Sequence, residues 1–308
     1  MIEVEKIDLG TKEISTVSDW LEVNDPICVD TVDRKYLWSE NILGHKETVI
    51  EFLNRVSCYK KKYLNIIGNL FFIPGGRILA NIDLNKLGIK CTYSNCYVIA
   101  GPEDNIESIY EVAKKMARTF SYGGGVGIDI SRLAPRDARV RNTAEYSTGS
   151  VSFCETYSEV ANTIGQNARR GALMICIRDD HPDLMQFITH KSDLNLTTGA
   201  NMSVKMSDKF FETLKQGPIA SYKYNSTENS SYVSTTMDHD TWLLHFERPE
   251  TGEKIEKYVN PNDVMDLIVK TVWDFGEPGV LFWDTINNYC LLGPDPDFKY
   301  EATNPCGK

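Results

Sequence analysis

DNIESIYEVAKKMARTFSYGGGVGIDI, residues 104–130, is the stretch of sequence that decides the fold. Its first part repeats apolar residues with the 3.6-residue period of an amphipathic helix. The apolar face comprises Ile106, Ile109, Tyr110, Ala113, Met116, Ala117 and Phe120. This pattern predicts a helix over residues 104–120, with Asp104 and Glu107 forming a capping box at its start. A glycine run follows, and residues 125–130 are predicted to form a strand.

Short strands alternate with helices on both sides of this stretch. We predict further strands over residues 93–99, 173–177, 200–206 and 280–283, and further helices over residues 151–164, 181–191, 208–215 and 262–275. Pro182 is placed in the first turn of the second of these helices, and Gly276 ends the last one. Repeated strand–helix units imply a mostly parallel sheet, so the predicted fold class is α/β.

Two regions differ from this alternation. Residues 1–72 are predicted to be mainly helical, because residues 47–56 and 63–70 carry helical apolar patterns before the break at Ile73-Pro74-Gly75-Gly76. Residues 218–258 are rich in serine, threonine and asparagine and contain the apolar run Trp242-Leu243-Leu244. We interpret them as a β insertion at the surface. The expected domains are residues 1–72 and residues 73–308, the second of which carries the insertion.

The composition excludes several classes of function. The 308 residues are 42% hydrophobic and 25% charged, which is ordinary for a soluble globular protein, and the net charge is −10. An acidic chain is a poor general binder of nucleic acid, because phosphate neutralisation requires a basic surface. No segment approaches the roughly 18 apolar residues of a membrane span, and the N-terminus is not a signal peptide. The eight dispersed cysteines include no Cys-x-x-Cys pair, which argues against a zinc ribbon and against a disulfide scaffold. We expect a cytoplasmic protein without a metal site.

Two short motifs could bind phosphates. The glycines of residues 122–127 lie between a helix and a strand, whereas a dinucleotide fingerprint needs strand, glycines and helix in that order, so a tight turn is favoured. In residues 166–172, Arg169 and Arg170 accompany two amide side chains, and such planar donors suit the recognition of phosphates and bases. Taken alone, a solvated loop is the favoured interpretation of this second motif.

Two of the cysteines stand out by their positions. Cys96 lies in the middle of the strand predicted over residues 93–99, where the simplest interpretation is a buried core thiol. Cys306 follows Asn304 on a short turn that contains Pro305 and Gly307. This ending is unusual for a globular domain and indicates a loop that presents a reactive thiol. The alternative is an unstructured C-terminal thiol.

Nine motifs in a fixed order connect these features to a known family. They are IPGGRIL (73–79), NCYV (95–98), ED (103–104), GGGVG (123–127), STG (147–149), RRGA (169–172), DHPD (180–183), GEPG (276–279) and NPCG (304–307). Over about residues 45–308 the ordered set resembles the large, catalytic subunit of ribonucleotide reductase. It is most similar to the adenosylcobalamin-dependent enzymes and their aerobic diferric or dimanganese relatives.

The resemblance implies a fold and a function. In that family a ten-stranded α/β barrel, made of two five-stranded halves, surrounds a catalytic finger loop. This chain would supply the helical N-terminal region, the first half of the barrel and the finger at its C-terminus. The implied function is the radical-based reduction of ribonucleotides to 2′-deoxyribonucleotides for DNA synthesis.

The resemblance also implies roles for individual residues. The finger cysteine, here Cys306, becomes a thiyl radical that abstracts the ribose 3′ hydrogen, and Asn304 hydrogen-bonds the substrate. Cys96 matches one of two cysteines that reduce the 2′ position and become a disulfide. The positions that match the lining of the substrate site are Gly76, Asn95 and Gly125.

A second set of residues matches the family's allosteric site for a deoxynucleoside triphosphate or ATP. Asp104 matches the carboxylate that holds the effector ribose, although a helix cap alone also explains this residue. Arg136 and Arg141 fall in the loop that contacts the effector phosphates. The loop that transmits the signal to the substrate base contains Gln166, Arg169 and Arg170.

Two departures from the family pattern predict an incomplete enzyme. Lys308 stands where the family has a glutamate that transfers protons, and a lysine cation cannot act as that base. The partner of Cys96, the second half-barrel and the C-terminal redox cysteines would all follow residue 308. We therefore expect activity only with a second polypeptide. The alternatives are a non-catalytic, nucleotide-binding regulatory fragment and a degenerate remnant.

The resemblance implies further partners. The radical source would lie outside this chain, as adenosylcobalamin or as a metal-containing small subunit, and a thioredoxin-type reductant would supply electrons. The C-terminal half of the subunit would be a separate chain, and the assembled units would form a dimer. Whether the ribonucleotide substrate is a diphosphate or a triphosphate stays open.

Overall fold

The computed structural model of the chain describes residues 14–23, 25–140, 143–164, 171–216, 241–249, 251–295 and 297–307. The chain divides into two compact units, Met1–Asn95 and Cys96–Lys308, and each is described by itself. No helix within the described ranges is long and apolar enough to cross a membrane.

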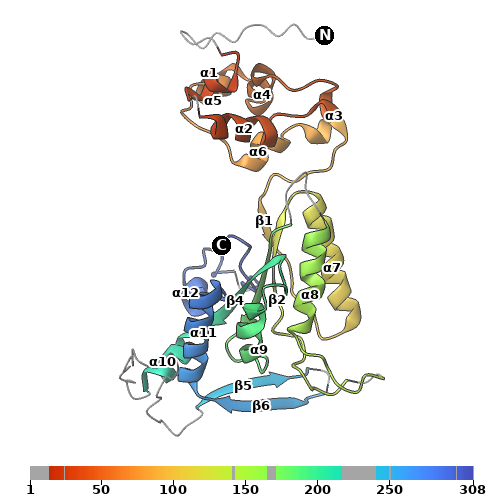
Figure 1. Ribbon diagram of the computed structural model, residues 1–308, viewed down its shortest axis with the longest axis vertical. Helices are drawn as coiled ribbons and strands as arrows, with labels where there is room; N and C mark the ends of the chain where they lie inside the picture. The colour runs from red at the N-terminus through yellow and green to blue at the C-terminus, as the bar shows by residue number, and fades with distance from the viewer. Residues whose placement is uncertain are drawn as a thin grey trace. The chain divides into compact units, whose positions relative to one another are not determined.

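The N-terminal unit is helical. Its elements are α1 (Val17–Leu21), α2 (Pro26–Lys35), α3 (Glu40–Leu43), α4 (Val49–Val56), α5 (Lys61–Gly68), α6 (Gly76–Asn81) and the 3-10 helix η1 (Leu84–Leu87) (Figure 1). Thr48 and Glu51 cap the start of α4 reciprocally. The helices share an apolar core that includes Trp20, Phe52 and Leu79. α4 and α5 confirm the helices predicted near residues 47–56 and 63–70.

A buried ion pair connects the last part of this unit to its helices. Arg55 and Glu47 pair at 2.7 Å with both side chains only 2% exposed. Arg55 also donates a hydrogen bond to the carbonyl of Leu79 at 2.9 Å, and Leu79 itself lies in the apolar core. Residues 73–95 therefore group with the helical unit, whereas the division was expected after residue 72.

The C-terminal unit is built on a five-stranded sheet whose strands all run parallel. In spatial order the strands are β1 (Cys96–Val98), β2 (Gly125–Asp129), β3 (Leu173–Arg178), β4 (Ala200–Met206) and β7 (Gly279–Phe282). Cys96 is in register with Gly125, and Leu173 with Ala200, so the first four strands begin at the same edge. This sheet confirms the predicted α/β class, although β1 is shorter than the strand predicted over residues 93–99.

Helices cover one face of the sheet. They are α7 (Ile106–Ser121), α8 (Ser152–Thr163), α9 (Leu184–Thr189), α10 (Asp208–Gln216) and α11 (Pro261–Phe275) (Figure 1). Side chains alternate between the two faces of a strand, and in β3 Ile175 and Ile177 lie in the core shared with the helices. Met174 and Cys176 point the other way and pack on Ala302 near the C-terminus. The second face thus receives the C-terminal segment.

Smaller elements complete this unit. The 3-10 helix η2 (His190–Ser192) extends α9, and α12 (Trp283–Asn288) follows β7 directly and was not predicted. β5 (Trp242–Glu247) and β6 (Lys254–Val259) form an antiparallel hairpin in the region expected to be a β insertion, of which residues 218–240 and residue 250 lie outside the described ranges. The indole of Trp242 donates a hydrogen bond to the carbonyl of Asp179 at 2.8 Å, which anchors the hairpin to the loop after β3.

The predicted capping box at the start of α7 is wrong. The cap is Asn105, whose side chain accepts a hydrogen bond from the amide of Ser108 at 2.8 Å. Asp104 accepts a hydrogen bond from the amide of Ala134 at 2.9 Å instead. A tertiary contact therefore replaces the local pairing with Glu107 that the sequence pattern favoured.

The predicted position of Pro182 is also wrong. Pro182 precedes α9 and does not lie in its first turn. The carboxylate of the next residue, Asp183, accepts hydrogen bonds from the amides of Arg136 and Ser150, at 2.9 and 2.8 Å. The residues before α9 thus serve to hold the loop that follows β2.

Candidate active site

Residues 301–307, called the finger segment below, cross the sheet face opposite α7–α11. The main chain of Thr303 runs so close to β2 that a Cβ atom on Gly127 would lie 1.9 Å from the Thr303 carbonyl oxygen. Ala302 and Thr303 are 3% and 2% exposed, and Ala302 packs on Cys176 of β3. The end of the chain is therefore docked on the sheet by close main-chain packing.

Charged side chains hold the start of the finger segment. The carboxylate of Glu301 pairs with Arg132, which also pairs with Glu103 at 2.5 Å, and it accepts a hydrogen bond from the amide of Gly101 at 3.3 Å. Burial opposes the charge on Arg132, but the two carboxylates outweigh this effect and raise the pKa of its guanidinium. On the main-chain side, Lys205 Nζ donates a hydrogen bond to the Glu301 carbonyl at 3.0 Å. Loops after β1 and β2, together with β4, thus fix this segment.

A tight turn presents Cys306. The side-chain oxygen of Asn304 accepts a hydrogen bond from the amide of Cys306 at 3.0 Å, and its carbonyl accepts one from the amide of Gly307 at 2.9 Å. Gly307 has a φ of +73°, a left-handed conformation that glycine adopts without strain. Asn304, which was expected to contact the substrate, therefore shapes the turn through its side-chain oxygen.

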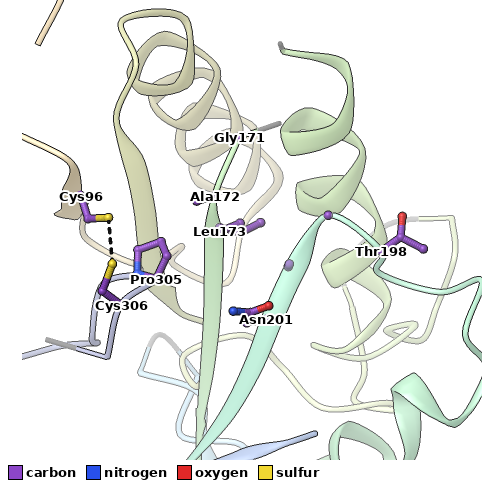
Figure 2. A pocket seen from close by; sticks show the side chains of 10 residues that line it. Cys96, Gly171, Ala172, Leu173, Thr198, Asn201, Pro305 and Cys306 are labelled. Atoms are coloured by element: carbon purple, nitrogen blue, oxygen red, sulfur yellow. Dashed lines mark hydrogen bonds between the residues drawn. The ribbon is translucent and has the colours of Figure 1, made fainter. Parts of the chain in front are cut away.

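The turn places the thiol of Cys306 next to that of Cys96. Their Sγ atoms are 3.7 Å apart although the two residues are separated by 210 positions (Figure 2). Gly125 of β2 is in register with Cys96, and a Cβ atom there would lie 3.2 Å from the Cys96 sulfur. The structure thus brings together three of the residues that were expected in the active site.

A cavity of about 320 Å³ opens beside the two thiols (Figure 2). It is lined by residues 171–173 before and in β3, residues 198–201 before and in β4, Pro305 and both cysteines. Its volume is at the lower end of the roughly 300–1,000 Å³ that small-molecule sites occupy. The sequence motifs did not indicate the polar lining residues Thr198 and Asn201. Thr198 precedes and Asn201 follows the start of the strand predicted over residues 200–206, and this position at a strand start was the available signal in the sequence.

Hydrogen bonds fix the loop that carries Thr198. On one side of it, Glu155 of α8 accepts a hydrogen bond from the amide of Thr197 at 2.7 Å. On the other side, Lys191 Nζ donates a hydrogen bond to the carbonyl of Ala200 at 2.7 Å. The wall of the cavity that β4 provides is therefore held by side chains outside the cavity.

Burial separates the cavity thiols from two other cysteines of the same unit. Cys154 and Cys176 are both 0% exposed. Desolvation raises the pKa of Cys176 to about 11 and also raises the pKa of Cys154. The thiolate is the reactive form of cysteine, so these two residues act as core side chains. Among the residues that the structure describes, no group of three or more His, Cys, Asp or Glu side chains could hold a metal ion.

The other two positions expected to line the substrate site belong to the N-terminal unit. Gly76 begins α6, where a Cβ atom would lie 3.1 Å from the hydroxyl of Tyr36. Asn95 is the last residue of that unit and directly precedes Cys96. Their participation in the site stays a prediction.

The segments expected at the allosteric site lie at two edges of the sheet. Asp104 is at the edge where the strands end, because it is bonded to Ala134 in the loop after β2 and pairs with Arg248 of the hairpin at 3.3 Å. Arg136 belongs to the same loop and has an exposed side chain. Gly171 lies at the opposite edge, beside the cavity. The remaining predicted positions, Arg141, Gln166, Arg169 and Arg170, lie outside the described residues, as does Lys308.

Comparison with known proteins agrees with this architecture. Residues 94–308 match the family model described as "Ribonucleotide reductase, barrel domain". A "Vitamin B12-dependent ribonucleoside-diphosphate reductase" of Thermoplasma acidophilum is 31% identical over 89% of this chain and 32% of the relative. A protein of the same name from Mycobacterium tuberculosis is 29% identical over 81% of this chain and 32% of the relative. A "Ribonucleoside-diphosphate reductase subunit alpha" of Helicobacter pylori is 25% identical over 66% and 26%.

A solved structure shows the same fold. The class Id ribonucleotide reductase alpha subunit of Actinobacillus ureae matches 95% of this chain and 46% of its own length, with a TM-score of 0.66 and 15% sequence identity. The chain spans about a third of the length of the Thermoplasma and Mycobacterium relatives. The family model covers the whole C-terminal unit, including the cavity and both of its thiols. On this evidence the chain belongs to the ribonucleotide reductase family, with residues 94–308 forming part of its barrel domain.

Proposed function

We propose that this chain is the part of a ribonucleotide reductase catalytic subunit that carries the radical cysteine and one reducing cysteine. The observation that supports this most directly is the 3.7 Å contact between the Cys306 and Cys96 thiols beside a cavity of small-molecule size. Hydrogen-atom transfer and two-electron reduction are both reactions of thiols. A ribonucleotide whose ribose enters this cavity would meet both groups.

The residues of the site have separate tasks in this proposal. Cys306, as a thiyl radical, abstracts the 3′ hydrogen of the ribose. Cys96 donates a proton to the 2′ hydroxyl, whose C–O bond breaks as water leaves, and the two reducing cysteines supply two electrons and become a disulfide. Thr198 and Asn201 supply hydrogen bonds from the β4 side of the cavity. Gly125 leaves the space that a side chain would take from the Cys96 sulfur. The second reducing cysteine comes from the part of the barrel that this chain does not contain.

The radical source is external to this chain in this proposal. The exposed thiol of Cys306 suits such an arrangement, since a hydrogen atom can be removed from it without opening the core. The names of the curated relatives favour adenosylcobalamin, and a metal-containing small subunit is the alternative. Either source supplies the oxidising equivalent for loss of the thiol hydrogen. A thioredoxin-type reductant then regenerates the cysteines.

A nucleoside triphosphate effector and a dimer complete the proposal. Asp104 and the loop with Arg136 lie at one edge of the sheet, whereas Gly171, next to the signal-transmitting loop, lies at the other. The two edges are connected by α8, whose 12 residues span about 18 Å. One nucleotide cannot contact both edges of one chain. Antiparallel association of two copies along α7 and α8 would bring an edge of each kind together.

The decisive experiment uses the complete subunit, assembled from this chain and the remaining barrel segments, with a radical source and a dithiol reductant. We expect Cys306→Ser to bind a ribonucleotide normally but to form no deoxyribonucleotide, because an alkoxyl hydrogen is far harder to abstract than a thiol hydrogen. Cys96→Ser should also give no completed reduction. Cys28→Ser, in the N-terminal unit, is the matched control and should retain activity. Near-normal turnover in Cys306→Ser would refute the assignment.

A further inference from the structure

The Cys96–Cys306 pair has a reactivity that the proposed reaction does not use. The sulfur atoms are 3.7 Å apart, and they must approach by roughly 1.7 Å to reach the roughly 2 Å of a disulfide bond. Cys306 is exposed on a turn, next to the glycine with φ of +73°. Cys96 begins β1, a strand at the edge of the sheet. Neither cysteine is locked in the core, so small movements of the turn can close the distance.

The surroundings favour oxidation of this pair over the core thiols of the unit. The cavity of about 320 Å³ gives a small oxidant access to both sulfur atoms. Cys154 and Cys176 are fully buried, and desolvation raises the pKa of each of their thiols. Oxidation follows exposure and thiolate character. A peroxide that enters the cavity therefore meets the cavity thiols and not the core thiols.

We propose that Cys96 and Cys306 form a peroxide-sensitive dithiol site that closes to an intramolecular disulfide. In the first step the Cys306 thiolate attacks hydrogen peroxide, the O–O bond breaks, and Cys306 becomes a sulfenic acid while hydroxide leaves and takes up a proton to give water. In the second step the Cys96 thiolate attacks the Cys306 sulfur, the S–S bond forms, the S–O bond breaks, and the leaving hydroxide takes up a proton to give a second water. Two electrons pass from the two thiols to one peroxide. A dithiol reductant reverses the change by thiol–disulfide exchange.

The consequence for activity rests on the proposed function. In a Cys96–Cys306 disulfide neither the radical cysteine nor the reducing cysteine is available as a thiol. The enzyme is therefore inactive while the disulfide is present. The bond also prevents oxidation of Cys306 to the sulfinic and sulfonic acids, which thiols do not reverse. The disulfide form is thereby a reversible inactive state of the site under oxidative conditions.

The test uses the 308-residue chain, in which Cys28→Ser and Cys58→Ser remove two exposed thiols of the N-terminal unit. After treatment with hydrogen peroxide, we expect a thiol titration to show the loss of two thiols per chain. Peptide mass spectrometry without reduction should identify a Cys96–Cys306 linkage that dithiothreitol removes. Cys96→Ser in this background should instead accumulate sulfinic acid at Cys306. Cys91→Ser, which alters a partly buried cysteine outside the cavity, should form the linkage like the parent.

Two results would overturn the inference. One is oxidation of Cys306 to sulfinic acid in the parent chain without any linkage to Cys96. The other is a linkage that forms to the same extent in urea, where native proximity is lost. The linkage is read without an activity assay, so it is independent of the proposed function. Conversely, the complete subunit could prove inactive while the chain still forms the Cys96–Cys306 linkage. That result would refute the proposed function and leave the inference about the disulfide intact.

Discussion

Lys205 of β4 donates a hydrogen bond from Nζ to the main-chain carbonyl of Glu301 at 3.0 Å, while it forms an ion pair with Asp129 of β2. The side chains of Lys205 and Asp129 are 8% and 9% exposed. The same ammonium group lies 4.4 Å from the ring centroid of Trp283, which adds a cation–π contact. One buried cation therefore links two strands to the finger segment, five residues before Cys306.

Lys205→Met should destabilise the protein by roughly 3 kcal/mol, because it leaves the Asp129 carboxylate buried without its partner. The free energy of unfolding is measured by urea titration. The double variant Lys205→Met/Asp129→Asn should recover at least half of the loss, since the amide oxygen can still accept the hydrogen bond that the Ser131 amide now donates at 2.7 Å. Lys209→Met, at an exposed position of α10, is the control. Equal stability of Lys205→Met and Lys209→Met would contradict the role of the ion pair.

Gly127→Ala should displace the finger segment. The added Cβ atom would lie 1.9 Å from the Thr303 carbonyl oxygen, and neither main chain can retreat without moving the segment. We expect a loss of roughly 1–3 kcal/mol in stability and a several-fold faster reaction of Cys176 with N-ethylmaleimide, followed by mass spectrometry, because Ala302 no longer covers that thiol. Gly75→Ala is the matched control, as no atom lies within 4 Å of its added Cβ. Unchanged labelling of Cys176 would show that the segment is not held by this contact.

The predictable part of the fold was the part with periodic apolar patterns. Residues 104–120 and 262–275 show helical periods, and they form α7 and α11 close to the expected bounds. The parallel sheet followed from the alternation of such helices with short apolar strands. These features arise from residues that are close together in the sequence, so the periodicity of apolar residues is sufficient to predict them.

The parts that sequence reasoning missed depend on distant residues. Asp104 and Glu107 have the spacing of a capping box, but Asp104 is bonded to Ala134, 30 positions away. Arg248 pairs with Asp104 from a hairpin that carries no motif. The contact that requires glycine at position 127 involves Thr303, far along the chain. For the site, the ordered motifs indicated Cys96 and Cys306, whereas the contact between their sulfur atoms became visible only in the structure.

The Asp104–Arg248 ion pair should contribute measurably to stability. Their side chains are 22% and 11% exposed, and the pair joins the hairpin to the loop before α7 at 3.3 Å. A double-mutant cycle with Asp104→Asn and Arg248→Met should give a coupling energy of about 1 kcal/mol. The control cycle is Glu111 with Lys114 on the exposed face of α7, where 47% and 73% exposure predict a coupling below roughly 0.5 kcal/mol. Equal coupling energies in the two cycles would show that the Asp104–Arg248 pair contributes no more to stability than an exposed ion pair.

Asp179 should make the protein less stable as the pH rises from about 4 to about 6. Burial raises the pKa of its carboxyl from 3.8 to about 6, although Ser207 donates hydrogen bonds to it from its amide and its hydroxyl at 2.6 and 2.7 Å. In this window the folded state retains a proton that the unfolded state has released. Proton binding favours the folded state, so the free energy of unfolding falls as the pH rises through the window.

The Asp179→Asn variant isolates this effect. Burial also lowers the pKa of His181 below 6.5, which removes stability as the pH falls, so the parent profile alone combines two opposed contributions. The difference between parent and Asp179→Asn cancels the histidine contribution. Urea titrations at intervals between pH 4 and pH 7 should show the parent losing roughly 2–3 kcal/mol relative to the variant as the pH rises. Asp208→Asn, at an exposed position of α10, should change the profile by less than roughly 0.5 kcal/mol. Parallel profiles for the parent and Asp179→Asn would show that Asp179 ionises at the same pH in the folded and unfolded states.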